Sequence, residues 1–181
     1  ATIHLRPSVP EPIVGTPRFD LTLTVPPRVA LRIEGGPGPL DVQNVRSVSV
    51  ESWTGDAKLR DVSRSIAISR IQGDLRLQRV GGGVRVLKGE GSLNAQELEQ
   101  GLTIEQHTAG RITVGHSAGA VVIGDDGAGD IEIYGLDGHV HIQADGAGDI
   151  EIRDISQGLR VDQDRGGRLR HTGVAGSVRL P

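Results

Sequence analysis

Glycine recurs along this chain at nearly constant intervals, and this repeat limits the possible folds more than any other feature. Successive glycines of the series lie 17 to 19 residues apart. Counted from each glycine, apolar residues return at offsets 2, 4 and 7 and again at 11 and 13, the last pair one residue early in the first repeat. A fixed period of this length indicates a solenoid in which each repeat forms one coil. The glycines are Gly38, Gly55, Gly73, Gly91, Gly110, Gly129, Gly148 and Gly167.

Within each repeat the apolar slots alternate with polar residues, as on a strand that buries one face. The repeat that begins at Gly129 shows this alternation at Ile131 and Ile133. Only Ser117 and His171 place a polar side chain in one of these apolar slots. We therefore predict an all-β fold, a single-domain β-solenoid (β-helix) of about eight coils of 18–19 residues.

The prolines support this prediction, because proline cannot donate a ladder hydrogen bond and is excluded from central strands. None of the nine prolines lies between Leu40 and Leu180. The prolines gather near the start of the chain, where they would blunt an open sheet edge. We divide the chain into a proline-rich leader (1–16) and a β-solenoid domain (17–181), which consists of an irregular N-terminal capping coil (17–37) and regular coils (38–181).

The composition argues against several classes of function. Twenty basic and 23 acidic residues give a net charge of −3, which is too balanced for a nucleic-acid-binding protein. Cysteine is absent, so there is no disulfide framework and no thiolate metal site. Trp, Tyr and Phe occur once each, too few for an aromatic platform, and we interpret Trp53 as covering a turn. We expect membrane association only through a segment preceding Ala1.

An acidic motif, Asp-Gly-Ala-Gly-Asp, occurs at 126–130 and again at 145–149. Stacking would place Asp126, Asp145 and Asp164 in a row, each about 4.8 Å from the next, because they share one offset. Calcium is conceivable at these three residues, since it prefers carboxylate oxygens. However, the calcium-binding β-roll needs two glycine-rich turns per coil, whereas this chain has one. We favour the interpretation that each Asp accepts hydrogen bonds from its own glycine turn, and we assign no metal, cofactor or catalytic residue.

The histidines give no sign of a transition-metal site, because no two of them share an offset in adjacent coils. We predict that they lie at the surface, with His171 hydrated at the open end of the last coil. The coils vary by only two residues in length, which leaves no loops to build a catalytic cleft, and no nucleophile motif occurs. We therefore expect that the protein is not an enzyme. The histidines are His4, His107, His116, His139, His141 and His171.

The coil motif Gly-Asp-Ile-x-Ile, at 129–133 and 148–152, resembles the bacterial toastrack and head-GIN adhesin-like families. The similarity extends to a proline-bearing strand pair at 19–33 and to a closing Gly-Ser-Val-Arg-Leu-Pro at 176–181. The resemblance implies a β-solenoid of uncharacterised role, usually extracytoplasmic and often beside a membrane anchor or an envelope-stress regulator. It implies no catalytic residues.

We therefore expect a non-enzymatic scaffold or interaction domain of the bacterial cell envelope. Its partners would be another protein, or further copies joined head to tail through the solenoid ends. The alternatives are a calcium-binding adhesin that uses the acidic turns and a polysaccharide-acting β-helix enzyme. One outward column changes from basic through neutral to acidic, which would suit either a solvated face or a guide for a partner. That column is Lys58, Arg76, Asn94, Thr113, Glu132, Glu151 and Arg170.

Overall fold

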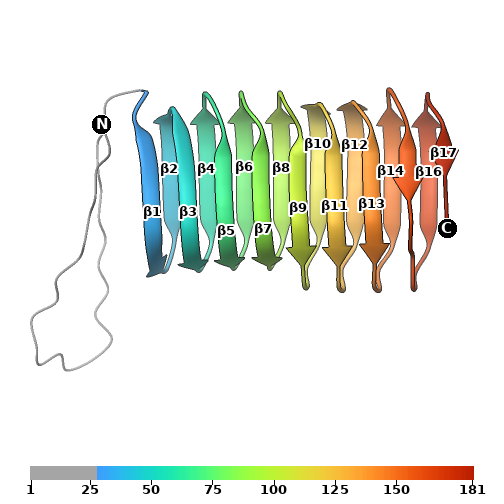
Figure 1. Cartoon of the computed structure of the whole chain (residues 1–181), viewed down its shortest axis with the longest axis horizontal. Coiled ribbons are helices and arrows are strands. Elements are labelled where there is room, and N and C mark those ends of the chain that lie inside the picture. Colours follow the sequence, from blue (N-terminus) through green and yellow to red (C-terminus); the bar gives the residue numbers. More distant parts are fainter. Residues whose placement is uncertain (1–27) are drawn as a thin grey trace, which may run out of the picture.

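The structure, a computed structural model, describes residues 28–181 as coils stacked along one axis (Figure 1). These residues form strands and turns and no helix, which confirms the predicted β-solenoid of about eight coils. The leader and the first part of the predicted capping coil lie outside the described residues. The strands are β1 (Ala30–Pro37), β2 (Leu40–Val45), β3 (Ser47–Thr54), β4 (Ala57–Val62), β5 (Ile66–Gln72), β6 (Leu75–Val80), β7 (Val84–Glu90), β8 (Leu93–Leu98), β9 (Leu102–His107), β10 (Ile112–Ala118), β11 (Val121–Asp126), β12 (Ile131–Asp137), β13 (Val140–Asp145), β14 (Ile150–Ile155), β15 (Leu159–Val161), β16 (Leu169–Val174) and β17 (Val178–Arg179).

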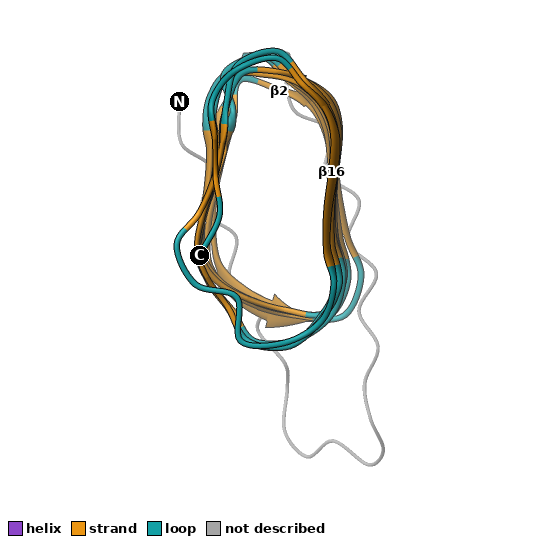
Figure 2. Cartoon of the chain, turned by 90° about the vertical axis from the view of Figure 1, so that its right-hand side faces the viewer, coloured by secondary structure: helices purple, strands orange, loops and turns teal. Residues whose placement is uncertain are grey.

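Two parallel sheets form the long sides of the solenoid. The nine odd-numbered strands make one sheet (the odd sheet) and the eight even-numbered strands make the other (the even sheet), and each strand pairs with the strands one coil before and after it. Seen along the axis, each coil is an elongated ring with the two sheets facing each other (Figure 2). Because each pairing joins one coil to the next, the ladder hydrogen bonds run along the rod.

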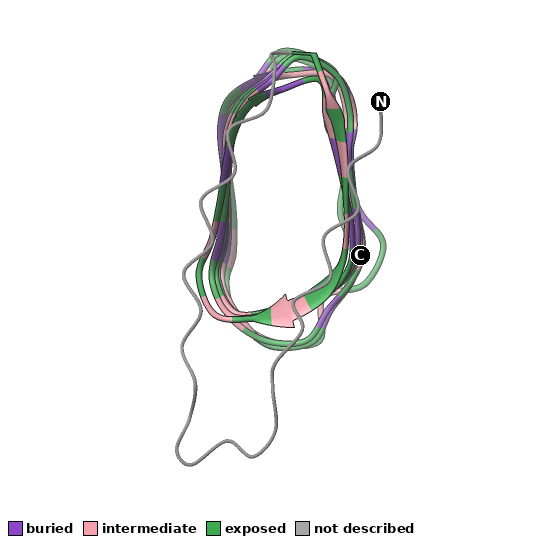
Figure 3. Ribbon diagram, turned by 90° about the vertical axis from the view of Figure 1, so that its left-hand side faces the viewer, coloured by how far each residue is buried: buried purple, intermediate pink, exposed green. Residues whose placement is uncertain are grey.

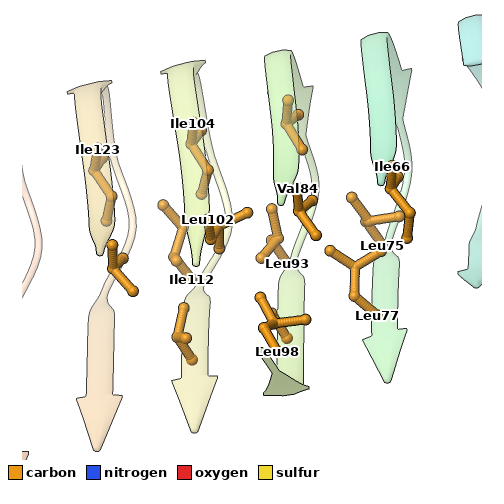
Figure 4. Close-up of a cluster of buried hydrophobic side chains, with 14 of the residues drawn as sticks. Ile66, Leu75, Leu77, Val84, Leu93, Leu98, Leu102, Ile104, Ile112 and Ile123 are labelled. Atoms are coloured by element: carbon orange, nitrogen blue, oxygen red, sulfur yellow. The ribbon is translucent and has the colours of Figure 1, made fainter. Parts of the chain in front are cut away.

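The apolar slots fill the interior in columns. Ile112, Ile131 and Ile150 are paired in register on β10, β12 and β14, and each exposes at most 1% of its surface. Aliphatic side chains from both sheets interdigitate between the strands (Figure 4), and the buried positions recur at the same place in coil after coil (Figure 3). The core is therefore closed by repeated layers of Leu, Ile and Val, as the scarcity of aromatic residues requires.

The repeated glycines lie at a corner where successive turns approach closely. Gly110 has a positive φ of 103°, and a Cβ atom there would lie 2.5 Å from the carbonyl carbon of Gly91. The amide of Gly110 also donates to the carbonyl of Ala128, 3.1 Å away, so pairing continues through the turn. Glycine is required here both by the backbone conformation and by the distance between coils.

A second corner residue with positive φ recurs six residues after each glycine. Only two of these residues are glycine, and residues with side chains fill the other positions at φ values of 48° to 58°. The following residue returns to the interior, so this kink ends the straight part of each even-numbered strand. The kink was not predicted. The residues are Asn44, Asp61, Arg79, Glu97, His116, Gly135, Asp154 and Gly173.

The first and last described coils differ in how much of their apolar surface is exposed. β1 pairs in register with β3, so Leu31 and Ile33 continue the interior columns. At the other end, β16 pairs only with β14 among the described strands, and Val178 is 37% exposed. His171 is exposed there, as predicted.

Ser117, the other polar residue in an apolar slot, is buried with its hydrogen bonds made. Its hydroxyl donates to the carbonyl of Gly115 at 2.9 Å and accepts from the amide of Leu98 at 3.2 Å. A buried hydroxyl satisfied in this way costs little stability. The part of the chain that the structure describes contains no apolar helix of membrane-crossing length.

Candidate functional site

One interior column is polar, and it is the most unusual feature of the molecule. β9, β11 and β13 end in His107, Asp126 and Asp145, which lie opposite one another in register, and a further bridge joins Asp145 to Asp164. Asp126 and Asp145 are fully buried and His107 is 2% exposed. We call these four residues the polar column. The predicted stacking of Asp126, Asp145 and Asp164 is thus confirmed.

The polar column occupies an inward position that the sequence pattern contained but our sequence analysis missed. The inward offsets 2, 4 and 7 of the first strand are mirrored by 11, 13 and 16 of the second, and offset 16 holds the polar column. This mirrored spacing is the signal that could have identified it. The residues at this position, in chain order, are Trp53, Ile71, Gly89, His107, Asp126, Asp145 and Asp164.

His107 corrects the prediction that the histidines lie at the surface. Its Nδ1 lies 2.8 Å from Oδ1 of Asp126, and its Nε2 lies 2.8 Å from the carbonyl oxygen of Gly91. The ring occupies space beside Gly89, where a Cβ atom would be 3.0 Å from its Cδ2. An imidazole is buried here because both nitrogens find oxygen partners and the preceding coil has no side chain.

The two buried aspartates correct a second prediction, that each Asp accepts from its own glycine turn. Among the described residues, Asp126 has His107 as its hydrogen-bond partner through Oδ1, while its Oδ2 and both oxygens of Asp145 have none. Only Asp164 behaves as predicted, accepting from the amide of Gly166 at 3.1 Å. The prediction was wrong for Asp126 and Asp145 because their side chains turn inward, away from the turn amides.

The pKa of Asp145 is raised from 3.8 to about 7. Burial is the largest cause, because it penalises the charged carboxylate. The negative charges of Asp126, Asp164 and Asp130 act in the same direction. Asp145 therefore holds a proton up to about neutral pH, which an ordinary surface carboxyl does not.

Other aspartates do bond the turns, from the position directly after the repeated glycine. Oδ1 of Asp130 accepts from the amide of Asp149 at 3.1 Å, and Oδ1 of Asp149 accepts from the amide of Arg168 at 3.0 Å. The pKa of Asp130 is lowered by its bond from the Asp149 amide and by the guanidinium of Arg111. The Gly-Asp motif is therefore explained by bonds between coils.

Among the shallow hollows on the surface of the described residues, two are lined largely by polar and charged side chains. The larger, of about 320 Å³, lies near the last coils and includes His139, His141, Arg160 and Arg179 in its lining. His141 and Arg160 both pair with Asp162, whose pKa is lowered by hydrogen bonds from Arg160 and His141. His139 and His141 thus face outward, as predicted.

The smaller hollow, of about 270 Å³, lies on the even sheet. It is lined by Asp41, Lys58, Arg60, Arg76 and Gln78. Arg60 pairs with Asp41 at 3.0 Å, which leaves two stacked cations, Lys58 and Arg76, beside it. This hollow is therefore a small basic patch.

Trp53 covers the turn at Gly38, as interpreted from the sequence. Its indole Nε1 donates to the carbonyl of Gly38 at 2.8 Å, and its ring lies against Gly36. The side chain is partly buried against the core. It is therefore engaged in packing.

A metal site would need several convergent ligands. Within residues 28–181, no group of three or more His, Asp or Glu side chains is arranged to hold a metal ion. The four members of the polar column are stacked along the rod and do not surround a common point.

No known protein family, no curated protein and no solved structure matched this chain in the comparisons made.

Proposed function

We propose that this β-solenoid is a non-enzymatic scaffold, which associates with further copies of itself head to tail through its open end or with another protein through its sheet faces. The observation that carries the proposal is the uniform stack: coils of nearly equal length present two flat sheets with side chains in long columns. Solenoids commonly use such extended surfaces for binding.

The two hollows support a role without catalysis. A glycosidase needs two carboxylates facing each other across the substrate. The lining of the larger hollow contains no carboxylate, and the smaller has Asp41 alone, already paired with Arg60.

The charge of the outward side chains on the even sheet changes from one end of the rod to the other. The column predicted from the sequence is in register from Lys58 to Arg170, with Lys58 and Arg76 towards one end and Glu132 and Glu151 towards the other. Arg153 pairs with both glutamates and reduces the negative charge. A partner protein would therefore meet a face whose charge changes along the rod, which favours one orientation.

The open end suits head-to-tail association. β16 and β17 each have one described neighbour, and Val178 on β17 and Leu180 after it expose 37% and 45% of their surfaces. An unpaired parallel strand with exposed apolar residues is a template for another strand.

Self-association is tested by sedimentation equilibrium over a wide concentration range. We expect the average mass of the wild type to rise with concentration. Val178→Lys should suppress this rise, because it places a charge on the open end. Ser49→Lys adds the same charge to the exposed middle of β3 and should leave the rise unchanged. A wild type that stays monomeric throughout would refute self-association.

The resemblance to the toastrack and head-GIN adhesin-like families supports a place in the bacterial cell envelope. Osmotic-shock fractionation of cells producing the protein from its full gene would test this location. Recovery only with the cytosolic markers would contradict it.

A further inference from the structure

The polar column places two carboxyl groups where the rest of the interior is aliphatic. Asp126 and Asp145 are both fully buried and lie opposite each other on β11 and β13. Two buried carboxylates without compensation would repel each other and lose their hydration. Something must therefore neutralise at least one of them.

His107 neutralises one. The carbonyl of Gly91 can only accept, so Nε2 of His107 must carry a hydrogen. Between Nδ1 and Oδ1 of Asp126 there is one further hydrogen, and the pair is either an imidazolium with a carboxylate or two neutral groups. In both cases His107 and Asp126 together carry no net charge.

Asp145 has no such partner. Both of its oxygens, and Oδ2 of Asp126, lie away from solvent with no donor in reach. Two carboxylates cannot bond to each other, but a carboxylic acid donates to a carboxylate through a strong, charge-assisted bond. A proton on Asp145 or on Asp126 would join Oδ2 of Asp126 to one oxygen of Asp145 and remove the repulsion between the two groups.

A metal ion fits the column less well than a proton. Calcium takes six to eight oxygen ligands, whereas the carbonyls of His107, Asp126 and Asp145 already accept from amides of the next coil. No convergent set of three side-chain ligands is present in the described part of the chain. A proton needs only the two carboxyl groups.

We propose that Asp126 and Asp145 share one proton in the folded protein, and that this bond is a pH-sensitive latch between the coils of β11 and β13. With the proton, the three groups His107, Asp126 and Asp145 carry no net charge. Without it, one negative charge remains in the core. The solenoid is therefore more stable at mildly acidic pH than at mildly alkaline pH.

Each charged group around the latch either favours the protonated form of Asp145 or is already paired with an opposite charge. His107 faces it from β9 and is bonded to Asp126, while Asp164 follows β15 and Asp130 precedes β12. Both aspartates oppose ionisation of Asp145. Because the pKa of Asp145 is raised from 3.8 to about 7, the folded chain keeps a proton that the unfolded chain has lost. The free energy of unfolding therefore falls as pH rises between these two values, and this contribution is constant above them.

The test compares urea unfolding of the wild type, Asp145→Asn and Asp125→Asn at about pH 5 and about pH 8. Asn at 145 donates to Asp126 at any pH, so the fall of its unfolding midpoint with pH should be clearly smaller than that of the wild type, and its midpoint should exceed that of the wild type at the higher pH. Asp125 is the exposed neighbour of Asp126 on β11, and its Asn variant should keep the wild-type fall.

Carboxyl ¹³C NMR of the wild type provides a second measurement that needs no variant. The Asp145 signal should titrate near neutral pH, about three units above an ordinary aspartate. Titration of both Asp126 and Asp145 below about pH 5 would overturn the proposal. It would also be overturned if calcium raised the unfolding midpoint of the wild type but not that of Asp145→Asn, because the column would then hold a metal ion. Neither result depends on whether the protein self-associates.

Discussion

At the scale of single residues, two turn glycines of this chain differ in whether a side chain would fit. Gly110 has a positive φ and faces the backbone of Gly91, so it has neither the conformation nor the room for a side chain. Gly83 also lies in a turn, but no atom lies within 4 Å of the position of its Cβ. The repeated glycines therefore fix the distance between coils, whereas Gly83 does not.

We predict that Gly110→Ala lowers the free energy of unfolding by at least about 2 kcal/mol, through strained backbone and forced separation of the coils. Gly83→Ala, the matched control, should change it by no more than about 0.5 kcal/mol. Chemical denaturation of both variants measures the difference. Equal losses would show that the approach of the glycines is unimportant for stability.

Only part of the candidate site could be predicted from the sequence: the stacking of the aspartates, but not their burial. The equal offsets of Asp126 and Asp145 predicted that they stack, because parallel coils align equal offsets. Their burial was missed because most residues at offset 16 are not apolar, so that only the mirrored spacing of the two strands marks this offset as inward. His107 was missed for the same reason, since it occupies the same offset one coil before Asp126.

At the scale of elements, the kink of the even-numbered strands is a recurring source of strain. Six of its residues have side chains at positive φ, a conformation that costs an L-residue about 1 to 2 kcal/mol. The strands themselves were predictable because inward and outward residues alternate. The kink was not, because residues as different as Asn, Arg, Glu and His occupy it.

We predict that Glu97→Gly raises the free energy of unfolding by about 1 kcal/mol, because glycine adopts the positive φ without strain. Asn94→Gly, in the extended part of the same strand β8, should lower it by about 0.5 to 1 kcal/mol. Thermal unfolding of the two variants gives the comparison. A loss of stability in both would mean that Glu97 contributes more through its side chain than its backbone costs.

At the scale of the whole molecule, each coil contacts only its neighbours. β3 lies between β1 and β5, and the same pattern continues along both sheets. Stability is then close to a sum over adjacent coils. The period predicted the number of coils and the single stack, because it counts the repeating unit directly. It could not predict partners, which depend on outward side chains that vary from coil to coil.

We predict that deleting residues 56–73, one complete coil, leaves a folded solenoid, because Gly55 is then followed by Asp74 in the original register. The urea m-value should fall by about one eighth, in proportion to the surface buried. Deleting residues 56–64, half a coil, should prevent folding by breaking the alternation between sheets. Circular dichroism across a urea titration distinguishes these results, and loss of folding in both deletions would contradict nearest-neighbour stability.

The first and last described coils lie at opposite ends of the rod, and the ladder bonds point along it (Figure 1). A stretching force applied at the two ends of this stack would be carried in series by the bonds between all the coils, and the outermost coils, whose strands have one described neighbour, would detach first. Each release would add slack on the order of 60 Å, the contour of one repeat. Such a stack would yield in steps of about one repeat each.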